Sequence, residues 1–174
     1  MRIETERLVL RLPQAGDVDE LGAIYSEPET MRFIGGTVDP EDMPARIERM
    51  RSRWEERGFG SLVAGRREDG RIVGDFGVYA WETLTWDLTS DLSLPHEVEL
   101  GWLLGERYRG LGDATEAALA VRESARSELA PPRLISLINV ENEASAAVAR
   151  RLGCDPTGRV ETAKYGTSEI WVHP

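Results

Sequence analysis

The chain has 174 residues, and its 31 acidic against 21 basic side chains give a formal net charge of −10. This length is typical of one domain with its own hydrophobic core, and no apolar run is long enough to cross a bilayer. The negative charge disfavours non-specific binding to nucleic acid or to an anionic membrane, and it weakly favours an amine-bearing partner. Because no signal peptide is visible at the first residues, we expect a cytoplasmic protein.

Cysteine and histidine are too few for several kinds of chemistry. Cys154 is the only cysteine, so a disulfide within one chain is excluded, and His96 and His173 show no metal-ligand spacing. Neither histidine has a motif spacing to Cys154, which favours a buried structural cysteine over a catalytic thiol. The phosphate loop GxxxxGKS or GxxxxGKT is absent, so nucleotide hydrolysis is disfavoured as well.

The first elements in chain order are a strand and two helices. Leucines alternate with other residues over 7–13, as in a strand with one buried face. A helix is expected over 16–25, where Asp17 and Glu20 have capping-box spacing. Apolar residues recur at helical spacing over about 41–57, and Gly58 is expected to stop this second helix.

A hairpin and a long strand are predicted in the middle of the chain. Residues 60–80 predict two antiparallel strands joined by a turn at Asp69-Gly70. Residues 81–95 lack a period and contain two tryptophans, which indicates a loop that either packs on its own aromatic side chains or faces a substrate. The sequence alternates again over 97–105, and this strand places Glu97 and Glu99 on the same face.

The remaining elements alternate helix and strand. A helix is expected from Gly112 to Pro131-Pro132, then an apolar strand over 133–140, then a helix from Asn142 to Gly153. Two short strands near 158–161 and 168–173 complete the chain. Because no linker or repeat divides it, we expect one mixed α/β domain over residues 1–174.

The sequence RYRGLGDATEA, residues 107–117, joins the strand at 97–105 to the next helix. Two glycines at a helix start leave backbone N–H groups free for an anion, although the pair alone is weak evidence. A dinucleotide-binding loop would need a third glycine where Thr115 stands, and it would need an acidic residue at the end of the next strand at the usual distance, where none is found. A nicotinamide-dependent oxidoreductase is therefore a distant alternative.

Four segments together resemble the GNAT superfamily of acetyl-CoA-dependent N-acyltransferases. They are TERLVLR near the start, ELGWLLGERYRGLGDATEA, the series Asn139-x-x-Asn142-x-x-Ser145, and RRLGC. Arg107-x-x-Gly110-x-Gly112 matches the signature of the superfamily, whose amides bind the pyrophosphate of CoA. The resemblance is closer to the Rim-type branch, which includes enzymes that acetylate the N-termini of ribosomal proteins.

The resemblance implies a fold and a set of ligands. The fold is a central, mostly antiparallel, twisted sheet of about seven strands, with a parallel splayed pair at the cofactor site and four flanking helices. Acetyl-CoA is the implied co-substrate, with no metal, and the implied acceptor is a peptide N-terminus or a small cationic amine; a homodimer is compatible with this. The residues that it implies contact CoA are Trp102, Leu103, Leu104, Arg107, Arg109, Gly110, Leu111, Gly112, Asp113, Ala114, Asn139, Asn142 and Ser145.

The resemblance also implies direct attack of the amine on the thioester in a ternary complex. Glu99 is the implied general base, and Glu97 on the same face is the rival candidate for this role. Alternatively, Glu99 is a sheet residue that forms a salt bridge. A backbone N–H near Leu103 stabilises the developing oxyanion. Ser145 is the implied proton donor to the leaving thiolate, because Ala149 stands where many members carry a tyrosine.

Other positions depart from the family pattern. Leu111 stands where relatives often carry lysine, and Asp113 stands where they usually carry an apolar residue. Asp113 and Glu116 have capping-box spacing, so the carboxylate can compete with a pyrophosphate for the same amides. Arg107 and Arg109 either compensate for this charge or are solvated surface residues. A catalytically silent acyl-CoA-binding domain is therefore the alternative to an active enzyme.

Two further questions stay open in the sequence. Asn142 and Ser145 share one helical face, where they either contact the ligand or only cap the helix. The acceptor is not identified: peptide termini, polyamines, amino acids and aminoglycoside-like amines all fit. Contacts to it are expected from residues 31–33, the second helix and the loop over 81–95.

Overall fold

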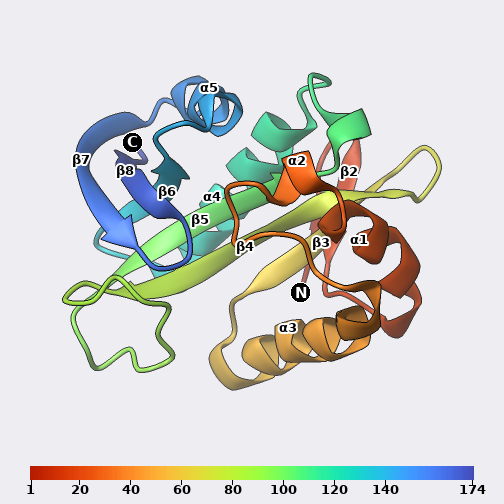
Figure 1. Ribbon diagram of the computed structural model, residues 1–174, viewed down its shortest axis with the longest axis horizontal. Helices are drawn as coiled ribbons and strands as arrows, with labels where there is room; N and C mark the ends of the chain where they lie inside the picture. Colours follow the sequence, from red (N-terminus) through yellow and green to blue (C-terminus); the bar gives the residue numbers. More distant parts are fainter.

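The alternating segments of the sequence form one eight-stranded sheet, of order β1-β2-β3-β4-β5-β6-β8-β7, in the computed structural model, which describes residues 1–174 (Figure 1). The strands are β1 (Arg2–Glu4), β2 (Leu8–Arg11), β3 (Ser61–Arg66), β4 (Ile72–Glu82), β5 (His96–Leu104), β6 (Leu134–Asn139), β7 (Asp155–Thr162) and β8 (Gly166–Val172). All neighbours are antiparallel except β5 and β6, which run parallel. The extra strand relative to the expected seven is β1, which pairs with β2.

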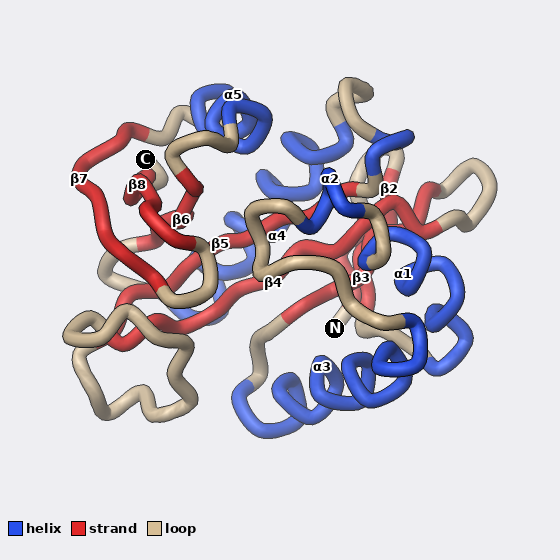
Figure 2. The backbone as a smooth tube through the Cα atoms, in the orientation of Figure 1, coloured by secondary structure: helices blue, strands red, loops and turns tan.

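Five α-helices and three short 3₁₀ segments connect these strands (Figure 2). The helices are α1 (Val18–Tyr25), α2 (Pro28–Met31), α3 (Met43–Arg57), α4 (Asp113–Leu129) and α5 (Glu143–Arg151), and the 3₁₀ segments are Ala15–Asp17, Pro40–Asp42 and Glu106–Tyr108. The one-turn helix α2 is the helix that the sequence does not predict. No helix has the length and apolar composition that crossing a bilayer requires.

The helices pack on the sheet to form one main core. In the view of Figure 1, α3 lies below the sheet and α4 passes behind it, where α4 contacts β4 and β5. The main cluster contains 34 buried residues, among them the alternating Leu8 and Leu10 of β2, both 0% exposed. Burial at this scale, at roughly 25 cal/mol per Å² of apolar surface, provides the main force that holds the layers together.

The structure corrects two local predictions. Asp17 and Glu20 do not form a capping box, because Asp17 accepts two hydrogen bonds from the Arg11 guanidinium and Glu20 accepts one from the backbone N–H of Ile72. Trp81 does not belong to a loop, because β4 extends through Glu82 and the indole is 1% exposed. The irregular segment is therefore shorter than expected, over residues 83–95.

Candidate active site

The site opens where the two parallel strands separate. β5 and β6 pair at only two positions, Val98 with Leu134 and Glu99 with Ile135, although β5 continues to Leu104. Beyond this point a side chain bridges the strands, because the Ser136 hydroxyl donates to the carbonyl of Leu100 at 2.6 Å. The separation leaves backbone groups of β5 unpaired on one side and creates room for a ligand between the strands.

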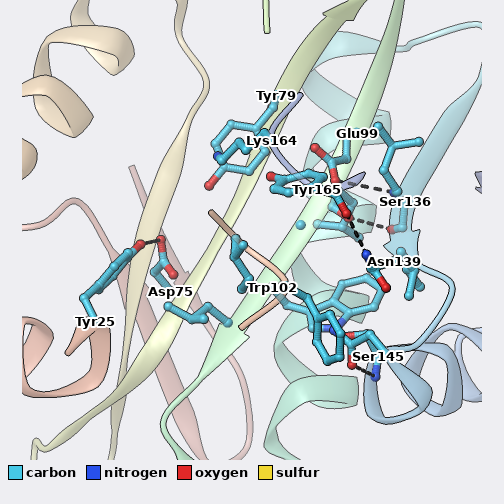
Figure 3. Close-up of a pocket in the computed structure, with 18 of the residues that line it drawn as sticks. Tyr25, Asp75, Tyr79, Glu99, Trp102, Ser136, Asn139, Ser145, Lys164 and Tyr165 are labelled. Carbon is cyan, nitrogen blue, oxygen red and sulfur yellow. Dashed lines mark hydrogen bonds between the residues drawn. The ribbon is translucent and has the colours of Figure 1, made fainter. Parts of the chain in front are cut away.

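Two cavities meet at this opening. The first, which we call the inner chamber, is lined by Tyr25, Phe33, Ile34, Arg46, Asp75, Tyr79, Glu99, Leu100, Gly101, Trp102, Leu103, Ser136, Leu137, Ile138, Asn139, Asn142, Ser145, Lys164 and Tyr165 (Figure 3). The second, the outer groove, runs over the start of α4 and the first turn of α5. The residues common to both are Phe33, Ile34, Trp102, Leu103, Asn142 and Ser145. A ligand that lies in the groove can therefore present one end to the chamber.

The floor of the outer groove is the glycine loop. Gly110 and Gly112 have φ of +78° and +87°, a left-handed conformation that favours glycine, and Gly112 is the residue before α4. The first turn of α4 has no side-chain cap, so its amides stay available to an anion at the positive end of the helix dipole. Arg109 lines the groove and donates to Thr30 at 2.7 Å.

Asp113 and Glu116 do not form the capping box that their spacing predicts. Arg7 lies 3.0 Å from a carboxylate oxygen of Asp113 and 2.6 Å from one of Glu116, and it also donates to the carbonyl of Leu111. Thr5 donates a further hydrogen bond to Glu116. We call this arrangement the Arg7 clamp. The single guanidinium offsets one of the two negative charges, and together with Thr5 it holds both carboxylates against the connection between β1 and β2. The Asp113 carboxylate is therefore paired with Arg7 instead of with the helix amides.

Two of the residues expected to contact the cofactor do not line the outer groove. Arg107 is exposed and does not line the groove, because its guanidinium stacks 4.6 Å from the ring centre of Tyr108. Asn139 lines the chamber but not the groove, and its side chain holds two backbone groups: it donates to the carbonyl of Tyr165 and accepts from the amide of Glu141. The other expected residues, from Trp102 to Ala114 and from Asn142 to Ser145, line the groove.

Glu99 is the carboxylate that β5 directs into the chamber. It is 2% exposed, and Trp81 Nε1 donates to its Oε2 at 2.5 Å. Burial raises the pKa of Glu99 to about 7, while the Trp81 hydrogen bond opposes this rise. Glu97, its rival on the same face, does not line the chamber and pairs with Arg133 at 3.1 Å.

The chamber contains a second buried carboxylate, which the sequence did not predict. Asp75 of β4 is 4% exposed, lines the chamber and accepts a hydrogen bond from the Tyr25 hydroxyl at 2.9 Å (Figure 3). Burial raises the pKa of Asp75 as well. An aspartate in the middle of the apolar run IVGDFGV was the signal for it, because an ionisable residue in a central strand needs a partner or a function.

Asn142 and Ser145 stand at the junction of the two cavities. Asn142 caps α5, since its Oδ1 accepts from the backbone N–H of Ser145 at 3.1 Å. This capping role is the alternative that the sequence left open, and it orients the first turn of α5 toward the groove. Ala149 is 0% exposed, so the position that often carries a tyrosine lies in the core here.

Cys154 is buried, as expected, but it does contact a histidine. His173 Nδ1 lies 3.2 Å from Cys154 Sγ, and its Nε2 lies 3.0 Å from the Ser136 hydroxyl. Burial raises the pKa of Cys154 to about 11 and lowers that of His173 to about 4, so both groups are neutral at pH 7. Because the Ser136 hydroxyl already donates to Leu100, the neutral imidazole donates from Nε2 and accepts the thiol proton at Nδ1. This is a structural contact between β6, β8 and the α5–β7 connection.

Comparison with known proteins gives one consistent result. A family model described as acetyltransferase (GNAT) domain matches residues 7–155. The uncharacterised protein YkkB of Bacillus subtilis is 27% identical over 158 residues, which cover 87% of this chain and 84% of that protein. The crystal structure of an acetyltransferase from Agrobacterium tumefaciens superposes with a TM-score of 0.80 at 29% identity, over 100% of this chain and 94% of the other.

One further solved structure shares the fold at lower identity. It is RimL, a ribosomal L7/L12 alpha-N-protein acetyltransferase, in complex with coenzyme A. The TM-score is 0.77 at 17% identity, and the match covers 99% of this chain and 97% of the other.

Proposed function

The chain belongs to the GNAT acetyltransferase family, and we propose that it moves the acetyl group of acetyl-CoA to a primary amine by direct attack in a ternary complex. The observation that carries this proposal is the junction of the two cavities. The groove ends at Trp102, Leu103 and Ser145, and the same residues open onto the chamber that holds Glu99. A thioester at the junction would thus meet an amine delivered from the chamber.

The outer groove suits CoA. Its free amides at the start of α4 match a pyrophosphate, and Arg109 adds a cation beside the same loop. The chain beyond the pyrophosphate would lie along the backbone of β5, where β6 has moved away. Leu111 is 54% exposed at the edge of the groove, so its replacement of a lysine removes a charge without closing the site.

Glu99 is the proposed general base. An amine must lose a proton before or during attack, and a carboxylate with a pKa of about 7 is partly ionised at neutral pH while it still accepts a proton readily. Trp81 holds one carboxylate oxygen, which fixes the direction of the side chain. Glu97 is the less suitable base, because it pairs with Arg133 and lies outside the chamber.

The backbone of β5 supplies the proposed oxyanion donor. Alternate residues of an antiparallel strand direct their backbone groups to opposite sides. The amide of Gly105 donates to Val73 of β4, and the register between the two strands is continuous, so Leu103 also faces β4. The pairing therefore favours the amides of Trp102 and Leu104, on either side of the expected Leu103, because both face the side from which β6 diverges. Of the two, Trp102 lies at the junction of the cavities.

Ser145 is the proposed proton donor to the leaving thiolate. It borders both cavities. Its backbone amide donates to Asn142, whereas its hydroxyl makes no hydrogen bond within the protein. Loss of the Ser145 hydroxyl should slow the departure of the CoA thiolate from the acetyl carbon, while the affinity of the protein for CoA should not fall. We place the reaction in the cytoplasm, because acetyl-CoA is an intracellular metabolite.

The test is an assay of thiol release over a panel of amines, paired with calorimetric titration of CoA. We expect CoA to bind and the free thiol to appear only when an amine is present. CoA binding without turnover on any amine would instead support a catalytically silent acyl-CoA-binding domain. Absence of CoA binding would contradict the whole proposal.

A further inference from the structure

The inner chamber carries more charge than acetyl transfer to a simple amine requires. Besides the buried carboxylates of Asp75 and Glu99, two basic side chains line it. They are Arg46 of α3 and Lys164 of the β7–β8 turn, of which Figure 3 labels Lys164. No salt bridge of the protein includes Arg46 or Lys164. Neither cation forms a direct ion pair, although Asp75 and Glu99 line the same chamber and attract them from a distance.

Arg46 is held at the chamber wall by an aromatic ring. Its guanidinium carbon lies 4.3 Å from the ring centre of Tyr25, and its Nε is buried without a hydrogen-bond partner. Buried donors without a partner are rare in folded proteins, and each one needs an explanation such as a missing ligand. A guanidinium is planar and matches a carboxylate with two parallel hydrogen bonds.

Lys164 approaches the same space from the opposite end of the chain. Much of this residue is exposed on the turn, but its side chain lines the chamber and its ammonium lies 5.0 Å from the ring centre of Tyr165. Burial lowers the pKa of Lys164, the Glu99 charge opposes this, and the Arg46 charge lowers it further. The two cations thus repel each other through the chamber, and the charges of Asp75 and Glu99 offset only part of this repulsion. An anion between the two cations would reduce it further.

We propose that the acceptor is an amine that also carries a carboxylate, the chemical class of the α-amino acids, with its carboxylate between Arg46 and Lys164 and its amine toward Glu99. This inference rests on the proposed acetyl transfer and narrows its substrate. A diamine fits less well, because its second ammonium would face the permanent charge of Arg46. A peptide N-terminus carries a neutral amide at the position where the free amino acid has its carboxylate.

The test compares each amino acid with its own decarboxylated amine, for example phenylalanine with phenethylamine and tyrosine with tyramine. Selectivity is the ratio of the two kcat/KM values. We expect the wild-type protein to prefer the amino acid about tenfold or more, as a charge-assisted contact would give. Arg46→Met, which replaces the guanidinium over the Tyr25 ring with an uncharged apolar chain, should lower this selectivity about tenfold. The matched control is Arg49→Met, an exposed position on the same helix, which should keep it.

Each outcome decides a different point. Equal or better turnover of the decarboxylated amines, or of a peptide N-terminus, would overturn the amino-acid proposal while acetyl transfer stands. Unchanged selectivity in a folded Arg46→Met would overturn it too. If that variant fails to fold, Lys164→Met on the exposed turn makes the same test, with the same loss of selectivity expected. Absence of turnover on every amine, with CoA bound, would overturn the proposed function itself.

Discussion

Removal of Arg7 should weaken both the fold and the binding of CoA. Its guanidinium lies 3.0 Å from Asp113 and 2.6 Å from Glu116; the Asp113 side chain is 4% exposed, whereas that of Arg7 is 43% exposed. A buried carboxylate that loses its partner costs about 3–5 kcal/mol. Because solvent screens the half-exposed guanidinium, we expect Arg7→Met to lower the free energy of unfolding by ~1–3 kcal/mol.

The same change should release the carboxylate of Asp113 beside the groove. An uncompensated negative charge at the start of α4 opposes a pyrophosphate there, and a difference of about 1.4 kcal/mol corresponds to tenfold weaker binding. We therefore expect the Kd for CoA, measured by calorimetry at low salt, to rise about tenfold. The double variant Arg7→Met with Asp113→Ala should recover most of this loss, because it removes the charge that Arg7 neutralises.

Arg2→Met serves as the matched control for this experiment. Arg2 lies on the neighbouring strand β1 and pairs only with the exposed Glu4, so stability and CoA binding should stay near those of the wild type. If Arg7→Met binds CoA as tightly as the wild type does, Asp113 has no influence on the pyrophosphate site. The role that we assign to the Arg7 clamp would then be wrong.

Two further predictions concern protonation. Trp81→Phe removes the indole donor that stabilises ionised Glu99, so the pKa of Glu99 should rise. The acid limb of the kcat/KM profile against pH should therefore move up by about one pH unit, whereas Trp86→Phe, the control, should leave it in place. An unmoved limb in Trp81→Phe would show that Glu99 does not set the pH dependence. His173 stays neutral in the folded protein because burial lowers its pKa from 6.5 to about 4, whereas the unfolded chain takes up a proton below pH 6.5. The free energy of unfolding should thus fall by about 3 kcal/mol more in the wild type than in His173→Gln between pH 7 and pH 4 in urea titrations; parallel curves would contradict this assignment.

The sequence predicts those features that depend on neighbours along the chain. Hydrophobic periodicity placed most strands and helices, and the turn at Asp69-Gly70, the glycine loop at 110–112 and the Asn142 cap all lie where local geometry requires them. The parallel pair β5–β6 followed from the resemblance and is present. The general position of the groove was therefore predictable.

The features that sequence reasoning missed depend on contacts between distant segments. Arg7 and Glu116 are 109 positions apart, so no local pattern links them. The spacing of Asp113 and Glu116 therefore predicted a capping box instead of the ion pairs with Arg7. Trp81 and Glu99 meet only because β4 and β5 pair, which turned an expected loop residue into the partner of the proposed base. His173 reaches Cys154 through the β7–β8 hairpin in the same way. No local pattern encodes these contacts.

The central claim is that Glu99 takes the proton of the amine that attacks the acetyl thioester. The most direct measurement compares the wild type with Glu99→Gln at a saturating amine concentration, together with the Kd for CoA of each protein. We predict that kcat falls about a hundredfold or more while the Kd changes less than twofold, because a general base contributes to the transition state and Glu99 lies outside the groove. Equal kcat values in the two proteins would contradict the account.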